Sequence, residues 1–261
     1  MASLSECDFK LPCCGKNAIV TGGASGIGQA TVEKLAKEGS TVAIFDINVA
    51  AGSCVAKELV AKGYNVVFEE VDVSSKDNCV EAVKRFAERN NGKRKPRTGE
   101  KSFSVNVFGC ANMVQACHPY MKQCSGTASV VNVASISGHR AQPSRWTYAS
   151  TKGAILALTK CMALDLSADK IRVNSISPAW VWSPEVSKAA GGDREKWEPV
   201  WGPFHMLRRL CETSEVATAI CFLLSEDASF ITGTDLPVDG GYMSMGPEGL
   251  GSSSSFAGTD Y

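Results

Sequence analysis

A short apolar run, a glycine-rich turn and an amphipathic segment follow one another near the start of this 261-residue chain. Residues 17–21 (Asn-Ala-Ile-Val-Thr) have the length and apolar character of a buried strand. Residues 22–28 (Gly-Gly-Ala-Ser-Gly-Ile-Gly) form the turn, and residues 29–38 carry apolar side chains at helical spacing. A strand, a glycine turn and a helix in this order predict a βαβ unit, and therefore an α/β fold with a parallel sheet.

The glycines of this turn allow the backbone to approach a ligand closely. At such a turn a pyrophosphate lies on the free N–H groups and the positive dipole end of the following helix. No Gly-Lys-Ser or Gly-Lys-Thr follows, which excludes a P-loop. Because a glycine-rich turn alone is weak evidence for a dinucleotide site, other residues have to support it. The candidate cofactor contacts here are Gly22, Ser25, Gly26, Ile27 and Gly28.

Two further apolar runs each end in a carboxylate. Residues 41–45 lead to Asp46, and residues 65–71 lead to Asp72. At the end of the second strand of a nucleotide-binding sheet, a carboxylate accepts hydrogen bonds from the adenosine ribose and repels a 2′-phosphate. Asp46 therefore favours NAD over NADP, although a helix N-cap is an alternative role for it. Asp72, together with Val73, could contact the adenine, or Asp72 could cap the helix that follows.

Tyr148 and Lys152 lie four residues apart in a segment with helical periodicity, so their side chains should share one face. A free tyrosine loses its proton only near pH ~10. An ammonium one turn away favours the phenolate and brings the tyrosine toward general acid–base chemistry at neutral pH. Ser135, just past a predicted buried strand, could return a hydroxyl to the same site, and Ser137 is the alternative. Taken alone, the Tyr-x-x-x-Lys spacing could equally be a coincidence on an ordinary helix.

Taken together and in this order, these motifs resemble those of the short-chain dehydrogenase/reductase family. The matching residues are Thr21-Gly22-x-x-x-Gly26-x-Gly28, Asp46, Asp72-Val73, Asn106 in Val105-Asn106-Val107-x-Gly109, Ser135, Tyr148-x-x-x-Lys152, Pro178-Ala179-Trp180-Val181-x-Ser183 and Val238-Asp239-Gly240-Gly241. The resemblance spans residues 14–245. It implies one Rossmann-like, doubly wound parallel α/β domain over residues 1–245, with NAD as the cofactor.

The resemblance also implies a role for each residue of the chemical step. Tyr148 would be the acid–base, and Ser135 would bind the substrate oxygen. Lys152 would assist the tyrosine and bind the nicotinamide ribose. Asn106 would bind a water in a proton relay; the alternative is a polar residue that simply finds a partner within its helix.

The second half of the chain supplies the substrate side of the predicted site. By resemblance, Pro178, Val181 and Ser183 would lie near the nicotinamide. Ala179 replaces the usual glycine after the proline, and Ser183 replaces the usual threonine. Residues 180–205, rich in Trp, Pro and Gly, are interpreted as a lid over an apolar or ring-bearing substrate. Packing of these tryptophans in the core is the alternative.

The chain departs from the family between Asp72 and Asn106. The family has there a strand with Asn-Asn-Ala-Gly in the middle of the sheet, and this sequence lacks that motif. Residues 93–99 (Lys-Arg-Lys-Pro-Arg-Thr-Gly) are too basic for a strand buried on both faces, and Pro96 cannot donate to a central ladder. We therefore expect an exposed connector, with a nuclear-localisation patch as the alternative. The central fourth strand is expected to be absent or replaced, which leaves unpaired backbone unless the sheet closes up.

Composition excludes several classes of protein. Lysine plus arginine and aspartate plus glutamate both number 27, so no charge excess indicates nucleic-acid or anionic-membrane binding. The eleven cysteines include no Cys-x-x-Cys pair, and the three histidines lack ligand spacing, so no metal is predicted. Reduced core cysteines in a cytoplasmic protein fit better, although the Cys13-Cys14 pair has no assigned role. No secretory signal or membrane-spanning run is found.

The sequence therefore predicts an oxidoreductase that transfers a hydride between NAD(H) and a secondary alcohol or ketone. By resemblance it would assemble as a homodimer or homotetramer. The alternative, which the missing strand favours, is a non-catalytic variant that acts as a binding or oligomerisation subunit. Residues 246–261, rich in Gly and Ser, are expected to form a flexible tail.

Overall fold

Six parallel strands, grouped in two three-stranded sheets, form the framework of the described chain. A computed structural model describes residues 12–89, 101–124, 126–246 and 249. The first sheet has the order β1-β2-β3 and the second β4-β5-β6. The strands are β1 (Asn17–Thr21), β2 (Thr41–Asp46), β3 (Val66–Glu70), β4 (Ala128–Val133), β5 (Ile171–Pro178) and β6 (Asp235–Val238).

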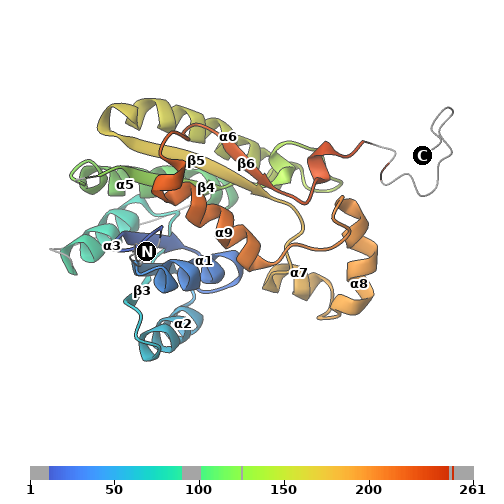
Figure 1. Cartoon of the computed structure of the whole chain (residues 1–261), viewed down its shortest axis with the longest axis horizontal. Helices are drawn as coiled ribbons and strands as arrows, with labels where there is room; N and C mark the ends of the chain where they lie inside the picture. Colours follow the sequence, from blue (N-terminus) through green and yellow to red (C-terminus); the bar gives the residue numbers. More distant parts are fainter. Residues whose placement is uncertain (1–11, 90–100, 125, 247–248, 250–261) are drawn as a thin grey trace, which may run out of the picture.

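Helices connect successive strands and cover both faces of each sheet (Figure 1). The main helices are α1 (Gly26–Lys37), α2 (Val49–Ala61), α3 (Lys76–Arg89), α5 (Gly109–Met121), α6 (Trp146–Leu166) and α9 (Thr213–Leu224). The shorter ones are α4 (Lys101–Phe103), the π-helix η1 (Ser104–Phe108), η2 (Ile136–Gly138), η3 (Ser167–Asp169), α7 (Pro184–Ala189), α8 (Arg194–Trp201), η4 (Gly202–Phe204), η5 (Glu226–Ala228) and η6 (Tyr242–Ser244). None of the helices in the described part of the chain has the length and apolar character needed to span a bilayer.

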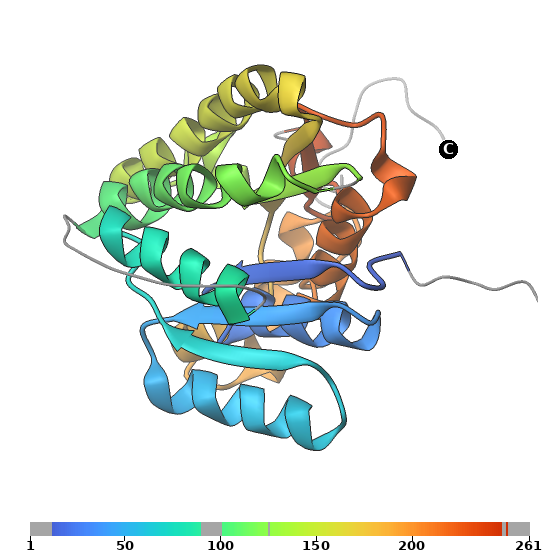
Figure 2. The ribbon, with the colours of Figure 1, turned by 90° about the vertical axis from the view of Figure 1, so that its left-hand side faces the viewer.

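Strand β2 shows why the first sheet needs helices on both faces. Its residues 42–45 are fully buried. Because side chains alternate along a strand, Val42 and Ile44 pack toward α1 and α2, whereas Ala43 and Phe45 pack toward α3 and α5. Figure 2 shows these strands side by side, with α2 next to β3.

The two sheets do not pair with each other in the described residues. β1 pairs with β2, and β4 pairs with β5. The residues of β1 and β4 are mostly half-buried, whereas every residue of β5 is buried. The expected α/β fold with parallel strands is confirmed. The expected doubly wound sheet is divided into two three-stranded sheets in the described chain, at the place where the central fourth strand was expected to be absent or replaced. The predicted connector 93–99 lies outside the described residues, as does most of the predicted tail 246–261.

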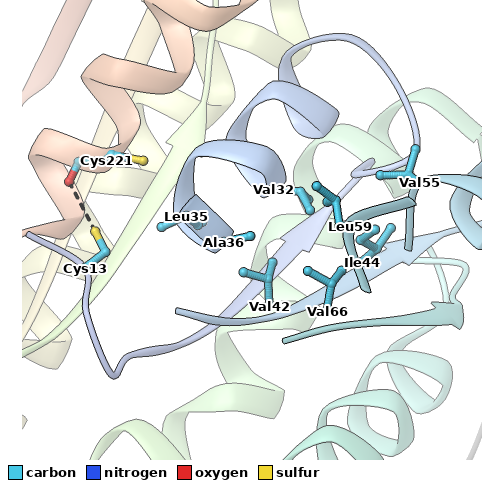
Figure 3. Packing of buried hydrophobic residues seen from close by; sticks show 10 residues of the cluster. All are labelled: Cys13, Val32, Leu35, Ala36, Val42, Ile44, Val55, Leu59, Val66 and Cys221. Atoms are coloured by element: carbon cyan, nitrogen blue, oxygen red, sulfur yellow. Dashed lines mark hydrogen bonds between the residues drawn. The ribbon is translucent and has the colours of Figure 1, made fainter. Parts of the chain in front are cut away.

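Helix packing connects the two sheets. On one face, α1 lies beside α9, and Val32, Leu35 and Ala36 of α1 share a core with Cys13 and Cys221 (Figures 1 and 3). On the other face, α3 packs against α5 through a second buried cluster. Burial of each large aliphatic side chain stabilises the fold by ~1.5–3 kcal/mol. The two helix layers are thus continuous where the strand ladder is interrupted.

Leu35→Ala tests the contribution of the α1–α9 layer. Leu35 is 2% exposed, so we expect the free energy of unfolding to fall by about 2–5 kcal/mol because a cavity remains. Urea denaturation measures this loss. The control Leu164→Ala removes a side chain that is 76% exposed on α6 and should change stability by less than about 0.5 kcal/mol. Equal losses in the two variants would contradict the assignment.

Candidate active site

The glycine turn is folded so tightly that three of its positions require glycine. Gly22 and Gly26 have positive φ angles of 66° and 55°, and the Gly22 N–H donates to the Phe45 carbonyl at 2.8 Å. A Cβ on Gly28 would lie 2.0 Å from the Gly22 carbonyl oxygen, which is sterically impossible without movement. Ser25 precedes α1 with extended backbone, and its side chain makes no capping bond to the helix. The predicted turn therefore leaves the start of α1 free of a side-chain cap.

The segment after β5 lies directly over this turn. A Cβ on Gly26 would meet Pro184 Cδ at 3.4 Å and Ser183 Cβ at 3.7 Å. Ser183 caps α7 by accepting a hydrogen bond from the Val186 N–H at 3.4 Å, and it donates to Glu185 Oε2 at 3.0 Å. A cleft of about 600 Å³ lies between α1, α7 and the start of α9. Two predicted cofactor contacts, Gly26 and Ser183, thus line one cleft.

Asp46 lies at the end of β2, and its carboxylate faces the glycine turn. It accepts hydrogen bonds from the Ala24 N–H at 3.1 Å and the Asn48 N–H at 2.9 Å. The residue that caps α2 is Asn48, which accepts from the Ala51 N–H at 3.1 Å. The alternative role of Asp46 as a helix N-cap is therefore wrong. Its carboxylate connects the end of β2 to the turn.

Asp72 also bonds locally. Its Oδ1 accepts from the Ser74 N–H at 2.9 Å and from the Ser74 hydroxyl at 2.6 Å. The hydroxyl that accepts from the first turn of α3 belongs to Ser75, whose Oγ lies 3.2 Å from the Asn78 nitrogen. Asp72 therefore does not cap this helix. Its neighbour Val73 packs against α5, since a Cβ on Gly109 would lie 3.1 Å from the valine side chain.

Tyr148 and Lys152 lie on the same face of α6, as their spacing predicts. The Lys152 Nζ is 5.7 Å from the centre of the Tyr148 ring. It also donates a hydrogen bond of 2.7 Å to the Val133 carbonyl at the end of β4. Burial lowers the pKa of the Lys152 ammonium from its usual value. Tyr148 is 39% exposed, so its ring remains accessible to a ligand.

Ser135 and Ser137 form a short hydrogen-bonded chain beside this helix. Ser135 Oγ donates to Ser137 Oγ at 3.3 Å, and Ser137 Oγ donates to Gln142 Oε1 at 2.6 Å. A Cβ on Gly138 would lie 2.8 Å from the backbone of Lys152, so η2 packs directly on α6. Both serines are buried, and the choice between their hydroxyls for the substrate oxygen stays a prediction.

Asn106 lies on the π-helix η1 and contacts α6. Its Nδ2 donates to the Thr151 hydroxyl at 3.0 Å, and that hydroxyl donates to the Tyr148 carbonyl at 2.8 Å. Thr151 is completely buried. The π-helical turn at Asn106 is wider than an α-helical turn. The bond to Thr151 also fits the alternative of a polar residue with a local partner, so the relay role stays a prediction.

Pro178 and Val181 are buried beside the cleft. Pro178 is the last residue of β5. Val181 is 4% exposed, forms a β-bridge with Cys211 and packs in a core cluster with Val216 and Ile220. The side chain of Val181 is therefore structural, and only its backbone could face a ligand.

The tryptophans of residues 180–205 stack on one another. Trp201 lies between Trp180 and Trp197, at ring-centre distances of 5.1 and 4.7 Å. Phe204 lies 5.9 Å from Trp180. All three tryptophans are half-buried. The tryptophans thus pack mainly on one another and belong to none of the buried core clusters of the described residues, and both the lid and the core-packing interpretations stay predictions.

Arg145 is a candidate site residue that the sequence reasoning missed. Its guanidinium lies 6.0 Å from the centre of the Tyr148 ring and 5.7 Å from that of Trp180, within the range of cation–π attraction. It also lines a pocket of about 300 Å³ that includes Asn106 and Tyr148. The signal was its position three residues before Tyr148, on the same side of a helix start.

The predicted site residues therefore form two groups. The glycine turn, Asp46 and Asp72 belong to the first sheet, whereas Ser135, Tyr148 and Lys152 belong to the second. The predicted cofactor residues and the predicted acid–base residues thus lie in different sheets of one α/β fold. A family model described as "Enoyl-(Acyl carrier protein) reductase" matches residues 22–94 and 95–243. The chain belongs to the short-chain dehydrogenase/reductase family.

Relatives and solved structures agree with this assignment. The chain is 32% identical to 2,5-dichloro-2,5-cyclohexadiene-1,4-diol dehydrogenase of Sphingobium indicum over 88% of its length and 98% of that protein. It is 31% identical to cyclopentanol dehydrogenase of a Comamonas species, over 87% and 96%. The ligand-free structure of Thermoplasma acidophilum aldohexose dehydrogenase matches with a TM-score of 0.78 and 30% identity over 91% and 97% of the two chains.

Gly28→Ala tests how tightly Gly28 packs against the Gly22 carbonyl in the glycine turn. The added methyl must displace the Gly22 carbonyl, so we expect a loss of about 1–3 kcal/mol in unfolding free energy from overpacking. Gly153→Ala is the matched control on α6, because its Cβ would meet only the Gly138 carbonyl, at 3.6 Å, and should be neutral or stabilising by up to ~1 kcal/mol. Thermal and urea denaturation of both variants decide the matter, and a tolerated Gly28→Ala would show that the turn is looser.

Proposed function

We propose that this protein reversibly transfers a hydride between NAD(H) and a secondary alcohol or ketone. Family membership supports the reaction class, and the names of two relatives describe alcohol dehydrogenases. The observation that carries the proposal is the shared face of Tyr148 and Lys152 beside the end of β4. In this arrangement Tyr148 would be the acid–base group, and the ammonium of Lys152 would supply a positive charge beside it.

The glycine turn fits the pyrophosphate of a dinucleotide. Gly28 has no room for a side chain, and the start of α1 has no side-chain cap. A phosphate could therefore bind to the helix N-terminus and its dipole. Gly22, Gly26 and Ser183 would surround it. Asp46, at the end of β2, would accept hydrogen bonds from the adenosine ribose, which favours NAD.

When bound, NAD supplies the carbon that accepts or releases the hydride. In the direction of oxidation, the Tyr148 side chain accepts the proton of the alcohol hydroxyl while the carbon-bound hydrogen leaves as hydride. Ser135 positions the substrate oxygen by a hydrogen bond. Lys152 keeps its ammonium beside the tyrosine because the Val133 carbonyl fixes it. Asn106 supports α6 through Thr151 and would complete the proton path.

Arg145 and Trp180 extend the proposed substrate side. The Arg145 guanidinium lies near the Tyr148 ring and near the Trp180 ring, within cation–π range of both. A flat aromatic surface next to a cation suits a small ring that carries hydroxyl groups. We therefore propose a ring-bearing secondary alcohol as the substrate class. Assembly as a homodimer or homotetramer through α5 and α6 is proposed from the family alone.

Tyr148→Phe should abolish turnover and leave NAD binding intact. Loss of the general acid–base lowers kcat by at least ~100-fold, whereas the phenyl ring preserves the packing. Steady-state assays with cyclopentanol and NAD, combined with NAD titration by fluorescence, measure both effects. Tyr120→Phe is the control, since Tyr120 lies on α5 and is 37% exposed. Undiminished turnover in Tyr148→Phe would refute the acid–base assignment.

The split sheet favours a second candidate function, a non-catalytic binding or oligomerisation subunit. The cofactor residues of the first sheet and the acid–base residues of the second are connected by helix packing in the described chain, without a shared strand ladder. Hydride transfer requires the two groups to be placed within a few tenths of an ångström of the productive geometry, on the order of 0.5 Å. A subunit that binds a partner through its surface does not.

A thermal-shift titration with NAD and with NADP distinguishes the two functions. If the protein binds NAD, saturation at about 100 times the Kd should stabilise the fold by ~2.7 kcal/mol. NADP should stabilise it less, because Asp46 repels the 2′-phosphate. Asp46→Ser should remove this preference, whereas the control Glu70→Gln, at the paired position of β3, should retain it. A cooperative melt that neither nucleotide shifts would favour the non-catalytic function.

A further inference from the structure

Three side chains with metal-binding atoms meet in the core where the two halves of the molecule join. The sulfurs of Cys13 and Cys221 and a carboxylate oxygen of Glu38 all lie within 4.8 Å of one another. The three residues are 0%, 2% and 8% exposed. Figure 3 shows the two cysteines side by side, next to Leu35 and Ala36 of α1. The residues are far apart in sequence, so no motif spacing predicted this cluster.

The surrounding backbone fixes each of the three residues. Cys13 lies in the turn before β1, and its carbonyl accepts hydrogen bonds from the Ser40 hydroxyl at 2.7 Å and the Lys16 N–H at 3.2 Å. Glu38 is the residue that ends α1. Cys221 lies in the middle of α9. Three separate elements thus present their side chains to one point, as in a preorganised ligand set.

Glu38 has a buried acceptor without a protein partner. One carboxylate oxygen, Oε1, accepts from Lys34 at 2.8 Å. The other, Oε2, is buried and makes no hydrogen bond. Buried carboxylates are normally paired or coordinate a metal, because desolvation of an unpaired charge is costly. The second oxygen therefore faces the two thiols, whose ligand atoms lie within 4.8 Å of the Glu38 carboxylate, and it is free to coordinate a cation there.

The contact between the two thiols shifts their pKa values in opposite directions. The hydrogen bond from Cys221 lowers the pKa of the Cys13 thiol from its usual value. The same contact with Cys13, together with burial, raises the pKa of the Cys221 thiol. A bound metal deprotonates coordinating thiols outright.

We propose that Cys13, Cys221 and Glu38 bind one zinc ion that connects the turn before β1 to α9. Thiolate and carboxylate ligands in a small buried site suit zinc, whereas magnesium and calcium prefer oxygen ligands alone. With Zn–S bonds of ~2.3 Å, tetrahedral ligand atoms lie about 3.8 Å apart, so the cluster needs only a small contraction. A water would complete the tetrahedron.

The charges of this site balance. Two thiolates and one carboxylate carry three negative charges, and zinc and the Lys34 ammonium together carry three positive ones. The ion pair with Glu38 holds the Lys34 ammonium next to the proposed ligands. The position of the site gives the ion a structural role, since it joins the half that carries the glycine turn to the half that carries α6. The acid–base residues take no part in it.

Zinc titration of the purified, reduced, full-length chain tests the proposal. After removal of metals with a chelator, we expect one equivalent of zinc to bind in competition with a chromophoric chelator and to raise the melting temperature. Cobalt in place of zinc should give a thiolate-to-metal charge-transfer absorption. Cys13→Ala and Cys221→Ala should weaken zinc binding by at least ~100-fold and Glu38→Gln by at least ~10-fold, by loss of a direct ligand.

Two variants control for general damage to the core. Cys79→Ala removes another fully buried thiol, from the α3–α5 layer, and Glu33→Gln removes a carboxylate on α1 that pairs with Lys37. Both should bind zinc as the unaltered chain does. If the cysteine variants fail to fold, alkylation of the unaltered chain followed by mass spectrometry replaces them. Zinc should then protect Cys13 and Cys221 and leave exposed Cys54 reactive.

Three results would overturn the proposal. One is the absence of stoichiometric zinc binding and of thiol protection in the reduced chain. Another is zinc binding that Cys13→Ala and Cys221→Ala leave unchanged. The third is an intact mass about 2 Da lower than expected without reductant and no zinc binding after reduction, since a Cys13–Cys221 disulfide forms by loss of two hydrogens to an oxidant such as a peroxide. That outcome would assign the pair to redox chemistry.

Discussion

The packing of α1 against α9 is the interaction on which the relative placement of the two halves depends. The strand ladder that would otherwise fix β1 beside β4 is interrupted in the described residues. Burial of Leu35 and its neighbours against Cys221, with the α3–α5 layer on the other face, takes over this role. The Lys16 ammonium adds directional bonds to the Leu224 carbonyl and to Glu226, at 3.1 and 3.0 Å.

Because of this division, the chain can contain every predicted site residue while their relative position depends on packing far from the site. The glycine turn and Asp46 are fixed to each other by the Ala24–Asp46 bond within the first sheet. Lys152 and the end of β4 are fixed to each other within the second. Each group is locally rigid, because short-range hydrogen bonds determine it. Helix packing, the bonds of Lys16 and the contact of Ser183 and Pro184 with Gly26 determine the distance from one group to the other.

The sequence predicted local features well and the larger arrangement less well. Helix periodicity and glycine sterics determine the turn at residues 22–28 and the shared face of Tyr148 and Lys152, so both could be read directly. The split sheet was partly foreseen, because Pro96 and its basic neighbours exclude a central strand. The contacts of Arg145 and the Cys13–Glu38–Cys221 cluster were missed. They depend on tertiary packing between segments up to 208 residues apart, for which a single sequence carries no periodic signal.

The interrupted ladder also changes how the molecule can deform. Hydrogen-bonded strands resist sliding because every bond has a preferred length and direction, whereas packed helices slide past one another by small side-chain adjustments. In this molecule the two sheets meet through the packing of α1 on α9 and of α3 on α5, and no strand pair joins them in the described residues. We therefore expect small sliding movements between the sheets to meet less resistance than in a continuous ladder, and such movements would change the distance between the glycine turn and Tyr148.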